Sequence, residues 1–165
     1  MDVSLPTRTV GGSNCTSDST GSEVGRRIYA DDMLPYNIHH VAIAVRDLDA
    51  TIASFADQYG FEVLSRERIE EQGVDEAMIA VGGSHLQLLE PLDEMSPVGK
   101  FLGRKGEGMH HIAFAVADID AALEHLKDMD IELIDNSARI GGGGHRIAFV
   151  HPRALAGTLF ELVEV

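Results

Sequence analysis

The stretch IHHVAIAVRDLDA at 38–50 returns almost unchanged as MHHIAFAVADIDA at 109–121. At a constant offset of 71 residues, 8 of the 13 positions are identical, including two adjacent histidines and two aspartates. Self-similarity at a fixed offset is the mark of an internal repeat. The chain therefore holds two copies of one structural module, and we expect the two copies to adopt the same fold.

The residues after each repeated strand predict the same order of elements in both copies. Apolar residues at helical spacing follow, at Leu48, Ile52 and Phe55 and again at Ile119, Leu123 and Leu126. Asp47 and Asp118 are the expected N-caps and Gly60 a helix stop. Glycine turn signals then separate three strands in each copy, at 61–68, 74–81 and 84–90 and at 131–135, 145–151 and 157–164. We expect an α+β fold in which two tandem βαβββ modules form a cleft-shaped half-barrel pair.

The domain boundaries follow from the repeat and from the composition. The expected ranges are module one at 36–91, a linker at 92–108 with a helix in VGKFLGRKG (98–106), and module two at 109–165. Residues 1–35 are rich in Ser, Thr, Gly and Asp and cannot bury enough apolar surface to offset their ordering entropy. We expect a disordered tail, or an extension from a start codon placed too early, with Cys15 as an idle surface thiol.

The overall composition narrows the class of protein. The 165 residues, 44% of them hydrophobic, suffice for one packed domain. Thirteen Lys and Arg against 27 Asp and Glu give a net charge of −14, which excludes sequence-independent binding to nucleic acid. A single cysteine and the lack of a membrane-length apolar run favour a cytoplasmic protein with no membrane partner. The acidity fits either a salty cytoplasm or simple solubility.

The histidines of the repeat are candidates for a ligand site. Strict strand alternation places His40 and His111 on faces that otherwise carry alanine, as in the wall of a cavity. It places His39 and His110 on the opposite faces, where we expect packing or a hydrogen bond.

Two more polar residues occupy matching positions in the closing strands, SHLQLLE at 84–90 and TLFELVE at 158–164. Gln87 and Glu161 thereby join His40 and His111 in a set with pseudo-twofold symmetry. Imidazole, amide and carboxylate donors suit Co²⁺, Mn²⁺, Ni²⁺, Fe²⁺ or Zn²⁺, and the lack of thiolate argues against a structural zinc site. The alternative is that Gln87 and Glu161 are outward polar residues of half-exposed strands. His85 shares the face of Gln87 and is expected at the surface or in the pocket.

These residues together resemble the vicinal oxygen chelate superfamily, which includes glyoxalase I, extradiol dioxygenases and fosfomycin-resistance proteins. Within it, the chain is similar to the methylmalonyl-CoA epimerase family in EEQGVDEAMIAVG (70–82), LQLLEP (86–91), GMHHIAFAV (108–116), GGGGHRIAFVHP (141–152) and GTLFELVE (157–164). The resemblance runs from about Tyr36 to Val165. It implies a homodimer with one divalent transition metal per chain, Co²⁺ foremost.

The resemblance also implies roles for particular residues. The metal ligands fall on His40, Gln87, His111 and Glu161. Glu76 and Glu161 would be the acid/base pair, with Glu71 hydrogen-bonding or tuning Glu76. The implied reaction interconverts (R)- and (S)-methylmalonyl-CoA by C2 deprotonation, a metal-stabilised enolate and reprotonation on the opposite face. Without the resemblance, 70–76 reads as a solvated hairpin edge.

Other functions on the same scaffold stay open at this point. A glyoxalase-type isomerase would use similar chemistry, an extradiol dioxygenase would use two histidines and one carboxylate on iron, and a non-catalytic binding or resistance protein would use the cavity alone. The glycine run at 141–144 lacks a nucleotide-binding context and is expected to be a flexible rim loop. Candidate partners for CoA phosphates are Lys100, Arg104, Lys105, Arg139, Arg146 and Arg153.

Overall fold

A computed structural model describes residues 34–165 of the chain. The predictions for Cys15 and, apart from residues 34 and 35, for the N-terminal tail lie outside this range. The described residues belong to a single structural unit, Asp31–Val165.

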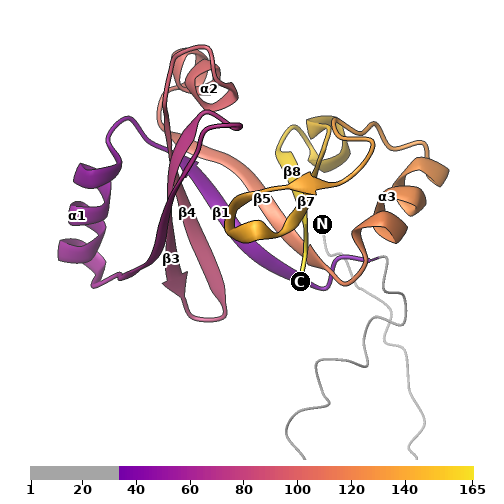
Figure 1. Cartoon of the computed structure of the whole chain (residues 1–165), viewed down its shortest axis with the longest axis horizontal. Coiled ribbons are helices and arrows are strands. Elements are labelled where there is room, and N and C mark those ends of the chain that lie inside the picture. Colours follow the sequence, from indigo (N-terminus) through magenta and orange to yellow (C-terminus); the bar gives the residue numbers. More distant parts are fainter. Residues whose placement is uncertain (1–33) are drawn as a thin grey trace, which may run out of the picture. The chain divides into compact units, whose positions relative to one another are not determined.

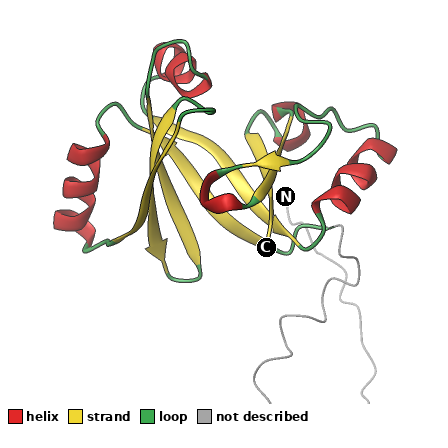
Figure 2. Ribbon diagram, in the orientation of Figure 1, coloured by secondary structure: helices red, strands yellow, loops and turns green. Residues whose placement is uncertain are grey.

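Eight strands form one sheet in the order β2-β3-β4-β1-β5-β8-β7-β6 (Figure 1, Figure 2). The first module supplies β1 (Asn37–Ala44), β2 (Val63–Ile69), β3 (Val74–Val81) and β4 (Ser84–Pro91). The second supplies β5 (Gly108–Val116), β6 (Arg139–Ile140), β7 (Arg146–Val150) and β8 (Leu159–Glu164). β1 and β5 run antiparallel at the centre, and each pairs in parallel with the last strand of its own module. The predicted α+β arrangement of two βαβββ modules is confirmed.

The three helices lie in the segments where the sequence predicts helices. Their bounds are α1 (Leu48–Tyr59), α2 (Pro97–Lys105) and α3 (Ile119–Asp128), with short 3₁₀ turns η1 (Gly142–Gly144) and η2 (Pro152–Leu155). Asp47 accepts from the Ala50 N–H and Asp118 from the Ala121 N–H, so both predicted N-caps are confirmed. None of the helices within 34–165 combines the length and the apolar character needed to cross a bilayer.

Helices α1 and α3 cover the outer face of the sheet, while α2 packs against β4, β1 and β5 at one end of the inner face. α1 packs on β3 and β4, and α3 on β7 and β8, so the two helices lie at opposite ends with the sheet between them (Figure 1). Leu48 and Ile119, at the start of each helix, are fully buried in the two module cores. Each outer face is therefore sealed by apolar packing, and polar groups gather on the inner face.

The prediction of a strand at 131–135 is wrong. This segment contributes only an isolated bridge between Leu133 and Val150. The amides of Ile134 and Asp135 both donate to the Phe149 carbonyl, and the Asp135 carboxylate accepts from the Phe149 N–H. Convergence of two donors on one carbonyl breaks the alternating pattern of an antiparallel ladder, so the strand does not extend.

The prediction that His39 and His110 face away from the site is also wrong. The pairing of β1 with β5 shifts register between Ile38 and His40 and again between Ala42 and Ile43. These shifts are β-bulges, which break the strict alternation of side chains. Both outer histidines consequently line the same cavity as His40 and His111.

Candidate metal centre

The central strands bring the two inner histidines together. Across the β1–β5 seam, His40 lies opposite Ala113, and His111 lies opposite Ala42. Each imidazole therefore stands beside a methyl group, which leaves room above the strand for the neighbouring ring. The alanine faces in the sequence serve this purpose.

The parallel pairings add the two closing-strand residues at the same level. Gln87 on β4 pairs with Ala42, and Glu161 on β8 pairs with Ala113. Each module thus places its closing-strand donor two residues along from its own histidine on a shared face. The four side chains line one cavity and are 3–8% exposed.

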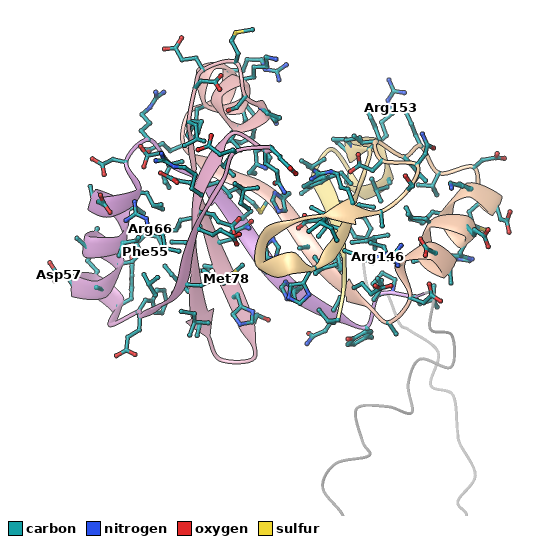
Figure 3. All side chains as sticks on the ribbon, viewed as in Figure 1. Phe55, Asp57, Arg66, Met78, Arg146 and Arg153 are labelled. Carbon is teal, nitrogen blue, oxygen red and sulfur yellow. The ribbon has the colours of Figure 1, made fainter. Side chains whose placement is uncertain are left out.

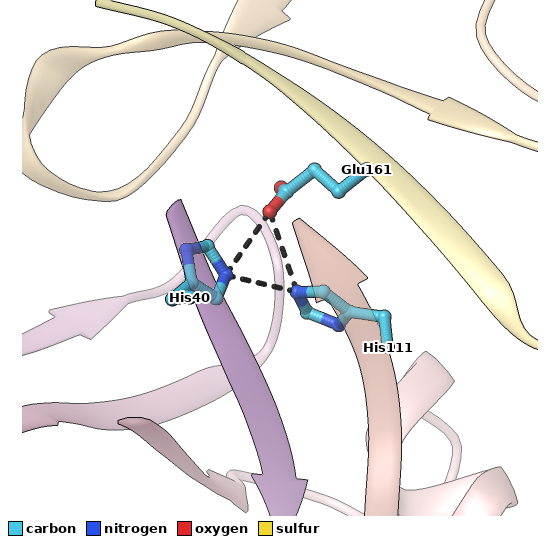
Figure 4. A group of neighbouring side chains, drawn as sticks. All are labelled: His40, His111 and Glu161. Atoms are coloured by element: carbon cyan, nitrogen blue, oxygen red, sulfur yellow. Dashed lines mark hydrogen bonds and ion pairs between the residues drawn. The ribbon is translucent and has the colours of Figure 1, made fainter. Parts of the chain in front are cut away.

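Three of the donors are spaced as ligands of one cation (Figure 4). The Nε2 atoms of His40 and His111 are 3.1 Å apart, and they lie 3.2 and 3.3 Å from Oε2 of Glu161. Adjacent ligand atoms of an octahedral ion with bonds of about 2.1 Å lie about 3.0 Å apart. The three side chains are therefore arranged for a small divalent metal.

The amide of Gln87 completes the test of fit. Its Oε1 is buried with no hydrogen-bond partner among the described residues, while its Nε2 donates to Oε2 of Glu76 at 2.7 Å. A buried unpaired carbonyl oxygen is costly, and coordination of a cation is one way to satisfy it. A two-nitrogen, two-oxygen donor set without thiolate fits a divalent transition metal.

Glu161 carries its charge in this site. Burial alone would raise its pKa, but the contacts from His111 and His40 outweigh burial and lower the pKa to about 2. Those contacts use the ring nitrogens that would otherwise bind the cation, so the low pKa belongs to the metal-free site.

Glu76 has the opposite electrostatic character. It stands on β3, 6% exposed, and its pKa is raised to about 7, first by burial and then by the charge of Glu67, against the opposing hydrogen bond from Gln87. A carboxylate with a pKa near neutrality both accepts and returns a proton at neutral pH.

Glu67 is a functional candidate that the sequence reasoning missed. It lies on β2 directly opposite Glu76 in the β2–β3 pairing, and its Oε2 accepts from the Gly143 N–H at 3.1 Å. The signal was available, since the 61–68 and 74–81 strands joined by a turn at Gly73 set this register. Glu71, expected to tune Glu76, lines the same cavity, and its role stays a prediction.

A cavity of about 880 Å³ connects these groups. The glycine run closes over it from module two, and a methyl group on Gly142 would lie 2.5 Å from Oε1 of Glu76. The segment expected to be a rim loop is thus in direct contact with Glu76 of module one.

The remaining histidines near the cavity are half-buried. Burial, followed by the neighbouring ligand histidine, lowers the pKa of His39 to about 4 and that of His110 to about 4, so both are neutral at pH 7. His85 lines the cavity, and its Nδ1 contacts the His39 carbonyl at 3.2 Å.

The basic residues considered for phosphate binding are placed unequally. Arg146 is paired with Asp120 and Glu164, and Arg153 pairs with Glu132 while it projects away from the sheet (Figure 3). Lys105 lies over the Phe101 ring, and Lys100 and Arg104 border a second hollow along α2. Arg139 borders the main cavity.

Comparisons with known proteins agree with this geometry. Residues 39–149 match the family model of the glyoxalase/bleomycin resistance protein/dioxygenase superfamily. An ethylmalonyl-CoA/methylmalonyl-CoA epimerase of Cereibacter sphaeroides is 36% identical over 78% of this chain and 97% of its own length.

Solved structures are similar over the same region. A Streptomyces coelicolor methylmalonyl-CoA epimerase variant in complex with 2-nitronate-propionyl-CoA is 46% identical, with a TM-score of 0.77 over 79% of this chain and 95% of that one. A methylmalonyl-CoA epimerase in complex with methylmalonyl-CoA and NH4+ is 47% identical, with a TM-score of 0.74 over 77% and 92%. The chain therefore belongs to the glyoxalase/bleomycin resistance protein/dioxygenase superfamily and, within it, to the methylmalonyl-CoA epimerase family.

Proposed function

We propose that this chain is a metal-dependent epimerase that interconverts (R)- and (S)-methylmalonyl-CoA. The observation that carries the proposal is the pair of buried carboxylates, Glu76 from module one and Glu161 from module two, beside two histidines and an amide in one cavity. The named relatives favour this reaction over a glyoxalase-type isomerisation or simple binding.

The chemistry requires two proton-transfer groups. C2 of the substrate lies between a thioester and a carboxylate, so loss of its proton leaves an enolate, and inversion needs a proton on the opposite face. A divalent cation bound at the site supplies Lewis-acid stabilisation of the negative charge. Glu76 takes the proton from one face while the C–H electron pair moves into the enolate. Glu161, which is ionised in the metal-free site, would have to hold a proton when the substrate is bound in order to return one to the other face. The reverse reaction exchanges the two roles.

The position of Glu76 suits its role as a base. Its raised pKa leaves an appreciable fraction ionised at neutral pH and gives that fraction useful basicity. The amide N–H of Gln87 at 2.7 Å holds one oxygen of the carboxylate, which fixes the direction of the other. Gln87 would therefore serve the metal with its oxygen and the base with its nitrogen.

The proposal includes finer statements about the holoenzyme. One divalent transition metal binds per chain through His40, Gln87, His111 and Glu161, with Co²⁺ foremost and Mn²⁺, Ni²⁺, Zn²⁺ or Fe²⁺ as alternatives. The enzyme is a cytoplasmic homodimer. The nitrogen and oxygen donor set supports the metal, and the family resemblance supports the dimer.

Hydrogen exchange at C2 tests the function directly. In D₂O, the metal-loaded protein should incorporate deuterium at C2 of methylmalonyl-CoA, and chelation should stop it. Glu76→Gln should slow the exchange by about 10²–10⁴-fold, whereas Glu124→Gln, at an exposed position on α3, should leave it unchanged. No exchange by a folded, metal-loaded sample rules out the epimerase.

A further inference from the structure

The two β-bulges of the central seam are repeated features of the duplicated module. At one bulge His39 is the extra residue on β1, because Ile38 pairs with Phe114 while His40 pairs with Ala113. At the other, His110 is the extra residue on β5, because His111 pairs with Ala42 while Met109 pairs with Ile43. A bulge re-aims the side chain of its extra residue. Both bulges turn an outer histidine towards the inner histidine that follows it.

The contacts that result are the same in both modules. Nδ1 of His39 lies 2.8 Å from Nδ1 of His40, and Nδ1 of His110 lies 2.9 Å from Nδ1 of His111. The ring centroids are 5.2 Å apart in each pair, with interplanar angles of 74° and 75°. The two modules thus adopt the same geometry at equivalent positions.

The proton count of such a pair determines what the inner ring can bind. A neutral imidazole carries one N–H, and a nitrogen–nitrogen hydrogen bond contains one proton. If the inner Nδ1 donates that proton, the inner Nε2 keeps a free lone pair. If the outer Nδ1 donates it, the neutral inner ring must carry its proton on Nε2. The Nε2 atoms are the ones that converge on Glu161, so only the first arrangement permits ligation.

We propose that His39 and His110 are positioning residues that accept the Nδ1–H of His40 and His111. They hold each ligand ring in the tautomer and orientation that present Nε2 to the cation. The inference rests on the proposed metal site and deepens it. Metal-bound histidines commonly donate their second N–H to a carboxylate or carbonyl. Here a neutral imidazole takes that place in both modules and adds no negative charge to a site that already holds Glu76 and Glu161.

A cobalt titration of the full chain tests the proposal without relying on activity. His39→Leu and His110→Leu remove the acceptor. Each should weaken Co²⁺ binding, followed by visible absorption at fixed pH, by about 10–100-fold. His39→Asn and His110→Asn place an acceptor oxygen at the bond position of Nδ1 and should bind within about threefold of the wild type. His125→Leu, on α3, is the matched control and should leave the affinity unchanged.

The outcomes separate this inference from the proposed function. Tight cobalt binding by the wild type together with leucine variants within twofold of it overturns the positioning role alone. Asparagine variants no better than the leucine variants also overturn it. A wild type that binds no cobalt overturns the metal site and the inference together. Circular dichroism checks that each variant is folded.

A second measurement needs no variant. In the zinc-loaded wild type, nitrogen-15 spectra of the imidazoles should show His40 and His111 protonated at Nδ1 and coordinated at Nε2. Coordination through Nδ1, or an Nδ1 without a proton, contradicts the proposal.

Discussion

The two modules have the same strand pairing but different side chains at equivalent positions. Gln87 pairs with Met78 in module one, as Glu161 pairs with Phe149 in module two. Two residues earlier on the third strand, module one has Glu76 where module two has the buried Ile147. Each module therefore contributes one carboxylate, at a different one of the two equivalent positions. The symmetric positions hold the proposed metal ligands, and the departure from symmetry places a carboxylate on each side of the cavity.

The largest effect should come from the positions where the modules are alike. His40→Ala and His111→Ala should both abolish stoichiometric metal binding, because each removes one of the converging Nε2 atoms. Loss of Lewis-acid stabilisation worth several kcal/mol should slow epimerisation by about 10³-fold or more. Elemental analysis and the deuterium assay measure the two losses. A variant that keeps one metal per chain would break the assigned ligand set.

The second largest effect concerns the contact between Gly142 of module two and Glu76 of module one. Gly142→Ala would place a methyl group 2.5 Å from Oε1 of Glu76 and should displace that carboxylate. A misplacement of about 1 Å can cost about 100-fold, so we expect C2 exchange to fall by about 10–100-fold with metal content unchanged. Gly103→Ala, which meets nothing within 4 Å, is the control. Equal rates in both variants would mean that the glycine run does not position Glu76.

The third effect concerns stability of the metal-free protein. Folded Glu76 holds its proton up to pH about 7, whereas its ordinary pKa is 4.5, so the folded state binds more protons between these values. The free energy of unfolding should therefore fall as pH rises from 4.5 to about 7 and then level off. The shift corresponds to a loss on the order of 3 kcal/mol.

Glu76→Gln should remove this pH-dependent fall in the free energy of unfolding. Urea denaturation at pH 5 and pH 8 measures the difference. The wild type should lose stability relative to the variant as the pH rises. Glu124→Gln should follow the wild type. Parallel pH profiles for wild type and Glu76→Gln would show that the carboxylate is not held protonated by its surroundings.

The smallest effect concerns the helix N-caps that both modules have. Asp47→Ala and Asp118→Ala each remove the side-chain acceptor at a helix start and should cost about 1 kcal/mol. The two losses should be similar because the caps have the same backbone conformation. Thermal unfolding compares them, and a cost confined to one module would show that the two copies do not depend equally on their helices.

The repeat made the four donors and the two N-caps predictable, because both follow from spacing alone. Strand alternation predicts that His40 and His111 face a cavity, and the repeat matches Gln87 with Glu161. The influence of Glu67 on Glu76 depends on the cross-strand register of β2 and β3, which the residue pattern of either strand alone does not show. The roles of Glu71 and of the CoA contacts stay predictions.

The two bulges and the 131–135 segment depart from the alternation of side chains that a regular strand has, so the sequence pattern does not predict them. The bulges at His39 and His110 break alternation through hydrogen bonding with the opposite strand. At 131–135 the apolar pattern resembles a strand, but the Asp135 side chain and one shared carbonyl satisfy the local amides instead. Such choices are made by tertiary contacts and not by local sequence.

The antiparallel seam between β1 and β5 has a consequence for the ancestry of the fold. A peptide containing one module would carry one inner histidine and one closing-strand donor, which is half of the proposed ligand set. Two such peptides joined along their first strands would complete it with identical halves. Two modules in one chain need not be identical, so Glu76 can stand on one side of the cavity while Ile147 occupies the equivalent position on the other.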